Sequence, residues 1–226
     1  MMMVSYLIKW QYMCCKRTVH PTYLFRLGID TEAIKDTPHF KLTSLIDEEL
    51  PECNQRDKID DLAEKFCVNH GASKNSRKRL EKALFLVPRS RLDLLAYYSR
   101  LAAIFDRVFH DISSPLVAEL EQQFHGLARW KKQVSLENRI RNARFIGELT
   151  KFRVAPPLVA LRCIRRCLDD FTGYNIDIAC CMLESCGRYL RRTKYTAPKL
   201  ASLMDTILRI QKAKVSMITV LIVQKL

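Results

Sequence analysis

Two amphipathic segments of the sequence resemble each other loosely at a separation of about 40 residues. The first runs from Asn142 to Arg153 and the second from Ile178 to Leu190. In the first segment, apolar side chains at helical spacing share one face, and Arg144, Lys151 and Arg153 are presented to a partner. Recurrence at this spacing is typical of stacked helix pairs, because one pair cannot bury its apolar face alone. A stack of this kind favours a scaffold over an enzyme.

Helix start and stop signals divide the rest of the chain in the same way. Gly71 is a predicted C-terminal stop, and Ser114 and Asn175 are predicted N-caps. The predicted helices span 55–71, 76–87, 90–109, 114–131, 135–153, 157–168, 176–190 and 196–214. The units begin near residues 55, 91, 136 and 176, a period of 36–45 residues that is typical of HEAT and armadillo repeats. With only six glycines and no alternating strand pattern, the chain is predicted to be all-α, a HEAT-like solenoid of antiparallel helix pairs.

Both ends of the sequence depart from this pattern. Residues 1–28 show no clear period and are expected to be disordered or accessory, and residues 29–214 are expected to form the helical-repeat domain. Residues 215–226 are an atypical apolar tail, in which Val215–Val223 is too short to span a membrane. If the last helix lacks a neighbour, this tail leaves apolar surface exposed.

Nine cysteines and no credible signal peptide indicate free thiols in a reducing compartment. We therefore expect a cytoplasmic protein, with a perinuclear or nuclear location as the alternative, and no membrane partner.

The net charge of +14 is unevenly distributed along the chain. Residues 29–64 carry eleven acidic against four basic residues, whereas the windows 73–100, 126–153 and 188–214 are strongly basic. RNA is the first acidic partner to consider, and acidic protein segments are the second. The plain alternative is that Lys and Arg solvate the outer faces of helical repeats.

The basic windows are the candidate functional surface. Its predicted members are Arg77, Lys78, Arg79, Lys131, Lys132, Arg139, Arg141, Arg144, Lys151, Arg153, Arg188, Arg191, Arg192 and Lys194. Two aromatic residues lie within these clusters and could stack on unpaired bases. Trp130, however, follows Leu120 and Leu127 at helical spacing, which favours a core position. Tyr195 stays open between the two roles.

No catalytic motif stands beside this surface. The sequence has no Gly-rich phosphate loop and no Gly-x-Ser-x-Gly elbow. Cys67 and His70 alone do not supply the four ligands of a structural zinc site. Adjacent carboxylates such as Asp60 and Asp61 point in different directions on a helix. We expect no enzyme, no catalytic residue, no metal, no cofactor and no small-molecule substrate.

Three segments resemble the middle domains of the initiation-factor-4G type. They are Leu84–Leu95 (LFLVPRSRLDLL), Arg144–Phe152 (RFIGELTKF) and Leu183–Leu190 (LESCGRYL). In this order and spacing they look most like the second of three such domains in the scaffolds of nonsense-mediated mRNA decay, over about residues 40–214. Residues 1–28 and the tail from Val215 depart from the family pattern.

The resemblance implies a non-enzymatic scaffold that connects the decay pathway's RNA helicase, its exon-junction adaptor and its large kinase. In the family, the adaptor and the helicase are held by parts that this chain lacks, so no binding residue is transferred. The leading expectation is a scaffold domain with a rigid helical surface. The alternatives are a direct RNA-binding module and a translation-initiation scaffold, because fold alone does not decide function. In the first segment, Phe145, Ile146 and Leu149 are expected to pack, and Gly147 to permit close approach of a neighbouring helix.

Overall fold

The computed structural model describes residues 37–127, 136–170 and 173–223, with side chains in the last helix as far as Ala213. Within these ranges every secondary-structure element is a helix, and no strand is present. The prediction of an all-α protein is therefore confirmed. Residues 1–28, Trp130 and the side chains of the apolar tail lie outside what is described.

The chain divides into two compact units, Met1–Ser44 and Leu45–Leu226. The described part of the first unit is α4 (Pro38–Ser44). The second unit begins with two short turns of helix, η1 (Leu45–Glu49) and η2 (Leu50–Glu52). It continues as α5 (Arg56–His70), α6 (Lys74–Phe85), α7 (Leu94–Asp106), α8 (His110–Leu127), α9 (Leu136–Lys151), α10 (Pro157–Asp169), α11 (Gly173–Arg192) and α12 (Ala197–Val223).

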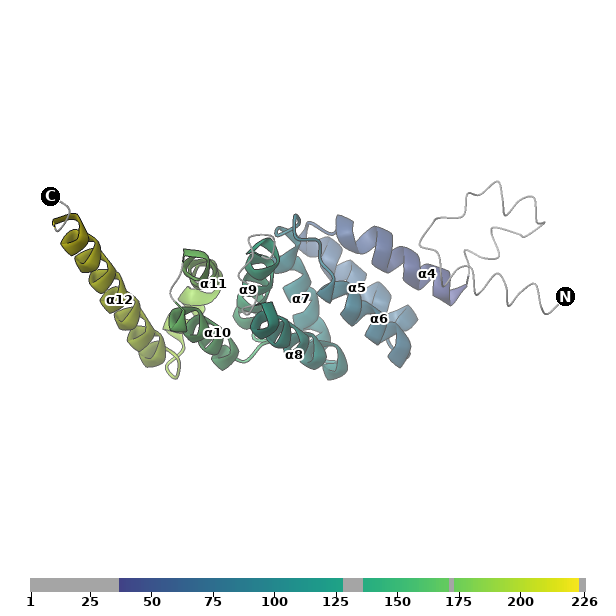
Figure 1. The fold of residues 1–226 in the computed structure, drawn as a ribbon. Helices are drawn as coiled ribbons and strands as arrows, with labels where there is room; N and C mark the ends of the chain where they lie inside the picture. Colours follow the sequence, from purple (N-terminus) through teal and green to yellow (C-terminus); the bar gives the residue numbers. More distant parts are fainter. Residues whose placement is uncertain (1–36, 128–135, 171–172, 224–226) are drawn as a thin grey trace, which may run out of the picture. The chain divides into compact units, whose positions relative to one another are not determined.

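The helices of the second unit form two rows (Figure 1). One row contains α5, α7, α9 and α11, and the other contains α6, α8, α10 and α12, with each helix in contact with the next member of its row. Polar contacts join equivalent positions of neighbouring helices: Asp60 with Arg100, Arg77 with Asp111, Glu121 with Arg162, and Arg139 with Asn175. Three of their separations, 40, 41 and 36 residues, lie within the predicted repeat of 36–45, and the Arg77–Asp111 separation of 34 is slightly shorter.

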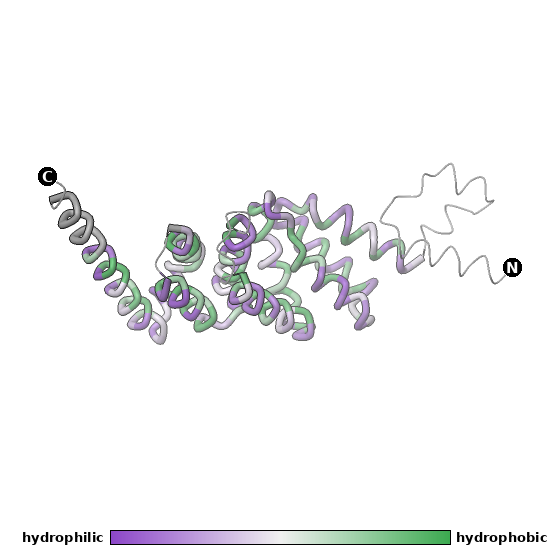
Figure 2. Tube along the Cα trace, in the orientation of Figure 1, coloured by the Kyte–Doolittle hydropathy of each residue, from purple (hydrophilic) through white to green (hydrophobic). Residues whose placement is uncertain are grey.

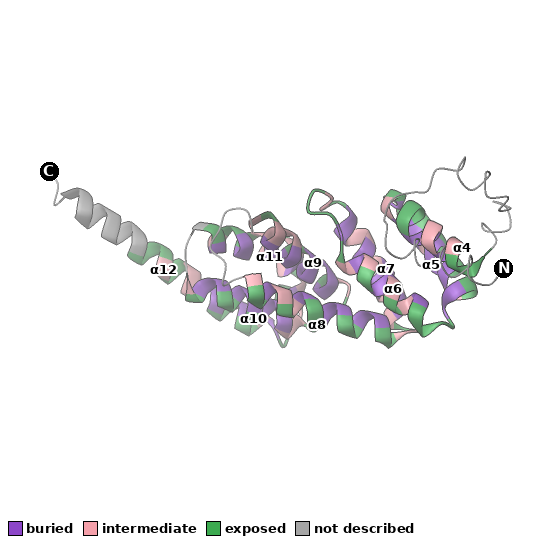
Figure 3. Cartoon of the chain, turned by 45° about the vertical axis from the view of Figure 1, so that its right-hand side comes forward, coloured by how far each residue is buried: buried purple, intermediate pink, exposed green. Residues whose placement is uncertain are grey.

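The core lies where the two rows meet. Hydrophobic and hydrophilic residues alternate around most helices, as Figure 2 shows, so that each helix has one face to bury. Helix α9 contacts α7, α8, α10 and α11, and most of its length from Asn142 to Thr150 is buried (Figure 3). Phe145, Ile146 and Leu149 are at most 1% exposed, as expected for packing residues.

Gly147 is the point of closest approach between α9 and α11. A Cβ atom built on Gly147 would lie 2.7 Å from Cβ of Ser185, closer than carbon atoms can approach. The two helices can therefore meet at this distance only because residue 147 has no side chain. The expectation for this glycine is confirmed.

Two predicted N-caps are wrong. Helix α8 begins at His110, not at Ser114, and Pro115 lies inside it. The side chains of His110 and of the buried Ser113, both in the first turn of α8, hydrogen bond to Asp106 at the end of α7. Helix α11 begins at Gly173, before Asn175.

Three further helix boundaries differ from the prediction. Helix α6 begins at Lys74, because the hydroxyl of Ser73 accepts a hydrogen bond from the amide of Ser76. Helix α7 begins at Leu94, after Asp93, and not at Ser90. Helix α12 continues through Val223, so the backbone of the predicted tail extends the last helix.

Candidate docking surface

The predicted basic residues separate into interior and exposed groups, and only the second can meet a partner. Lys131 and Lys132 lie outside the described residues. Among the others, three arginines are turned inward and are used by the fold itself.

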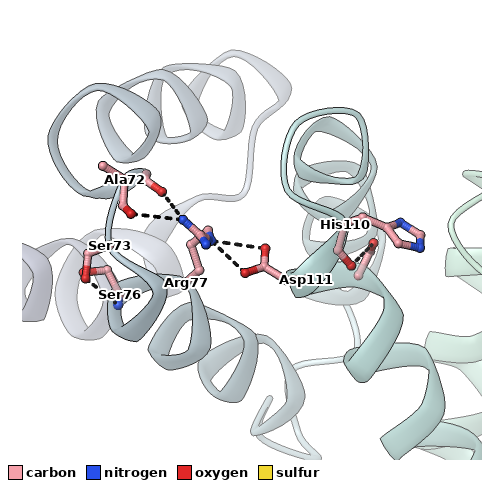
Figure 4. Close-up of polar contacts among 8 residues, drawn as sticks. Ala72, Ser73, Ser76, Arg77, His110 and Asp111 are labelled. Atoms are coloured by element: carbon pink, nitrogen blue, oxygen red, sulfur yellow. Dashed lines mark hydrogen bonds and ion pairs between the residues drawn. The ribbon is translucent and has the colours of Figure 1, made fainter.

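Arg77 joins the first two helix pairs. Its Nε donates to both carboxylate oxygens of Asp111 at 3.1 and 2.9 Å, and its Nη1 donates to the carbonyl of Gly71 at 2.6 Å and to that of Ala72 at 3.3 Å. Figure 4 shows the side chain between these partners. The guanidinium group also lies over the ring of Phe109, 5.0 Å from its centroid. Its side chain is only 17% exposed, so Arg77 is a structural residue.

Arg139 is buried and Arg141 is half-buried, which corrects the prediction that both lie on an exposed basic surface. Arg139 is 7% exposed and donates to the side-chain oxygen of Asn175. Arg141 donates to the carbonyl of Val87 at 2.6 Å and to the side chain of Gln123 at 3.2 Å. Burial lowers the pKa of both guanidinium groups from their ordinary values. Both arginines tie α9 to distant parts of the chain.

Two of the remaining cations are partly neutralised. Arg79 lies 3.7 Å from a carboxylate oxygen of Asp47, and Lys151 lies 2.5 Å from one of Glu148. Glu148 is buried beneath the exposed lysine, so this pair fixes Lys151 at the end of α9.

The other predicted cations are exposed. Lys78 lies on α6 and Arg144 on α9, while Arg153, Arg188, Arg191, Arg192 and Lys194 lie at or near the C-terminal ends of α9 and α11. We name Lys151, Arg153, Arg188, Arg191, Arg192 and Lys194 the cationic edge. In the described part of the chain, none of its arginines forms an ion pair with a carboxylate.

The parallel register of α9 and α11 brings the cationic edge together. Arg139 contacts Asn175, 36 residues later, and Gly147 faces Ser185, 38 residues later. The two helices therefore run in the same direction. The C-terminal ends of the two helices, at Lys151 and Arg192, therefore lie at the same end of the pair. Packed helices have axes about 8–10 Å apart, a distance that one extended peptide can bridge. Arg144 stands earlier in this register, beside Cys181.

Each of the two aromatic rings at the cationic edge has one lysine ammonium group near it. Nζ of Lys199 lies 3.9 Å from the ring centroid of Tyr195, which is 60% exposed, and donates to its hydroxyl at 2.8 Å. Nζ of Lys151 lies 5.8 Å from the ring centroid of Phe152. The sequence prediction missed Lys199. Its position four residues after Tyr195, near the start of a helix, could have indicated the contact.

The described residues contain no group of three or more potential metal ligands. Cys67 is half-buried and His70 is buried at the end of α5. Burial raises the pKa of Cys186 to about 12 and that of Cys167 to about 11, which keeps these thiols protonated and unreactive at neutral pH. The cysteines in the described ranges are free.

One grouping of Ser113, His110 and Asp106 contains the residue types of a hydrolase triad. Ser113 and His110 both contact the same oxygen of Asp106, and Ser113 is 1% exposed. A nucleophilic serine must instead contact the histidine and face the substrate. The grouping instead links the end of α7 to the first turn of α8. No helix in the described ranges is long and apolar enough to cross a membrane.

These features define a stack of helix pairs with an exposed basic edge, and comparison with known proteins names its class. Residues 46–217 match the MIF4G domain family, and the chain belongs to that family. Within it, the chain is similar to regulators of nonsense transcripts of the UPF2 type. It is 46% identical over 165 residues to "Regulator of nonsense transcripts UPF2" of Arabidopsis thaliana, covering 73% of this chain and 14% of the relative.

The similarity extends to animals and fungi. "Regulator of nonsense transcripts 2" of Homo sapiens is 39% identical over 166 residues, covering 74% of this chain and 13% of the relative. "Nonsense-mediated mRNA decay protein 2" of Schizosaccharomyces pombe is 34% identical over 144 residues, covering 64% of this chain and 13% of the relative. The chain therefore spans about one seventh of the length of these relatives, and the resemblance to proteins of nonsense-mediated mRNA decay is confirmed.

Proposed function

We propose that this chain is a non-enzymatic scaffold domain of nonsense-mediated mRNA decay that presents a rigid helical surface to protein partners. The observation that carries the proposal is the similarity of most of the chain to regulators of nonsense transcripts from a plant, mammals and a yeast. The decay helicase, the exon-junction adaptor and the kinase are its proposed partners within a larger scaffold. The proposed location is cytoplasmic, with perinuclear or nuclear sites as alternatives, and correspondence to the second middle domain remains a prediction.

The contacts between repeats support a rigid surface. Arg77, Arg100 and Arg162 each reach a carboxylate of the neighbouring helix in the same row, at 2.9, 2.6 and 2.7 Å. Such charge-assisted contacts hold successive pairs in one register. A partner that binds across several pairs then meets a preorganised surface, which lowers the entropy lost on binding.

A pull-down with the tagged full chain from cell extract tests the scaffold proposal. We expect it to recover the decay-pathway helicase, kinase or exon-junction components. Recovery of an initiation-type helicase alone would favour a translation-initiation scaffold. Recovery of none of the decay components would refute the decay role. The control is the chain with Gly147→Leu, which is expected to disrupt the α9–α11 contact.

Direct RNA binding is the second candidate, and the exposed arginines of the cationic edge favour it. Binding to phosphates releases counterions, so affinity should fall steeply with added salt. Titration with single-stranded RNA at two salt concentrations tests this candidate, with charge reversal at Arg144 and Lys151 to locate the site. Absence of binding at low salt would exclude it.

A further inference from the structure

Helix α11 carries an apolar stripe that the described chain leaves partly uncovered. Its members are Ile176, Cys180, Leu183 and Gly187, which recur at helical spacing and therefore share one face. Cys180 is exposed, and the other three residues are half-buried. A Cβ atom built on Gly187 would meet nothing within 4 Å except the side chain of Leu183 in the same helix. The space beside Gly187 is therefore open.

The corresponding stripe of α9 is covered by a helix. The resemblance between the two segments aligns Gly147 with Gly187 and Ala143 with Leu183, each 40 residues later. Ala143 is fully buried, and Gly147 packs directly against Ser185 of α11. Helix α11 is the last described member of its row, so no following helix of that row lies against its stripe. The stripe thus occupies a helix-packing face that the described chain does not fill.

The two ends of the row differ in polarity. On α5, the first helix of the row in the second unit, six of the eight exposed residues are charged, as expected for a solvated end of a helical stack. At the other end the open face of α11 is apolar, and the neighbouring α12 exposes Met204 by 39% and Leu208 by 49%. Exposed apolar surface of this kind indicates an interaction site. It offers no charged group to phosphates, so it is not a surface for nucleic acid.

The apolar stripe is complementary to a second copy of itself. When two α11 helices pack antiparallel about the middle of the stripe, Ile176 of each copy faces Gly187 of the other, and Cys180 faces Leu183. Each large side chain then meets a small residue, and every contact occurs twice, as in an isologous interface. Parallel packing would instead set Leu183 against Leu183 and leave a gap between the two copies of Gly187. The pattern of sizes therefore favours the antiparallel pair.

The charges beside the stripe fit the same arrangement. One flank of the stripe carries four exposed charged residues that sum to zero, namely Asp177, Glu184, Arg188 and Arg191. Antiparallel packing sets Asp177 of each copy level with Arg188 of the other, whereas parallel packing would set like charges level. From these observations we propose that the apolar stripe binds the same stripe of a second copy of this chain, which gives a twofold-symmetric dimer. The inference goes beyond the proposed scaffold function and does not depend on it.

Gly187→Leu tests the proposal, because it fills the space that Ile176 of the second copy would occupy. Sedimentation velocity over a concentration series measures the mass, which is 26.4 kDa for one chain. We expect the unaltered chain to approach twice this mass as concentration rises, and Gly187→Leu to weaken self-association at least about tenfold. Leucine favours a helix more than glycine does, so thermal unfolding should show that the variant is folded. The matched control is Gly126→Leu in α8, where a Cβ atom meets nothing within 4 Å, and it should change self-association less than about twofold.

A second substitution tests the antiparallel register. Ile176→Ala, added to the Gly187→Leu chain, vacates the space opposite the new leucine and should recover most of the lost self-association. Three results would overturn the proposal. They are an unaltered chain that keeps the mass of one copy up to about 0.1 mM, equal effects of Gly187→Leu and Gly126→Leu, and no recovery with Ile176→Ala. Because the scaffold proposal is tested by recovery of decay proteins, it can stand when the dimer proposal fails.

Discussion

Substitution of Gly147 by alanine tests how closely α9 and α11 approach. In an unobstructed helix interior, Gly→Ala stabilises by about 1 kcal/mol, because alanine restricts the unfolded chain. At position 147 the new Cβ would lie 2.7 Å from Cβ of Ser185, and that atom cannot move without moving α11. Overpacking of this kind costs about 1–3 kcal/mol. We therefore expect Gly147→Ala to lower the free energy of unfolding by about 1 kcal/mol net.

Gly187 is the matched control for this substitution. It lies in α11, and a Cβ atom there would meet only the side chain of Leu183, at 3.9 Å. Gly187→Ala should therefore stabilise the protein by about 1 kcal/mol. The free energies of unfolding of the two variants should therefore differ by about 2 kcal/mol, with Gly147→Ala the less stable. Urea denaturation followed by far-ultraviolet circular dichroism measures both values.

A double-mutant cycle identifies the clashing atom. Ser185→Gly removes the Cβ that Gly147→Ala would strike, so the double variant should be more stable than the sum of the two single changes by about 1–2 kcal/mol. If Gly147→Ala stabilises the protein as much as Gly187→Ala does, α9 and α11 are not in close contact, and the packing described above is wrong.

Three further predictions concern ionisable side chains. Arg77→Ala should lower the free energy of unfolding by about 3 kcal/mol, and Asp111→Ala should add little in that background, as chemical denaturation would measure. Glu81 is 5% exposed with one carboxylate oxygen lacking a hydrogen bond, and its pKa is raised first by burial and then by Glu119. Because the pKa of Glu81 is higher in the folded than in the unfolded protein, its ionisation lowers the free energy of unfolding as pH rises through that interval. Glu81→Gln should therefore raise the free energy of unfolding by about 1 kcal/mol at neutral pH. This gain should vanish below about pH 4, where the glutamate is protonated in both states. Because the φ angle of Arg153 is 66°, Arg153→Gly should raise the free energy of unfolding by about 1 kcal/mol, and a decrease would show that the arginine is held by the fold.

The repeat architecture could be predicted because each pair carries its own signals. Phe145, Ile146 and Leu149 recur at helical spacing, and the repeat period follows from the start of each stripe. Gly147 could be assigned to a close helix contact because a glycine inside a strong helix has few other uses. These features depend on residues that are near one another in sequence.

The placement of the arginines could not be predicted from local pattern. Arg139 and Arg144 look alike in sequence, yet Arg139 is buried and Arg144 is exposed. Burial of Arg139 depends on Asn175, which lies 36 residues away. The predicted N-cap at Asn175 failed for the same reason, since its side chain serves this tertiary contact and also donates to the carbonyl of Asp170 at 2.5 Å.

The positive φ of Arg153 had no sequence signal at all. A helix end of this type is normally marked by glycine, and the chain has arginine there. Likewise, Pro115 suggested a helix start because proline is common at the first helical position. The helix begins upstream at His110, where the side chains of His110 and Ser113 contact Asp106 of α7, a contact that single-residue preferences do not reveal.

The arrangement in two rows limits how far the effect of a local structural change spreads along the stack. Each helix touches only its neighbours, so mechanical and energetic coupling should fade with the number of intervening pairs. The Arg77–Asp111 contact lies in the early pairs, whereas Arg153 lies between α9 and α10. A partner held at the cationic edge would therefore steady the later pairs and leave the earlier ones free to respond separately. The same chain could then bind two partners at once, one at the early and one at the later pairs, with little effect of one on the affinity for the other.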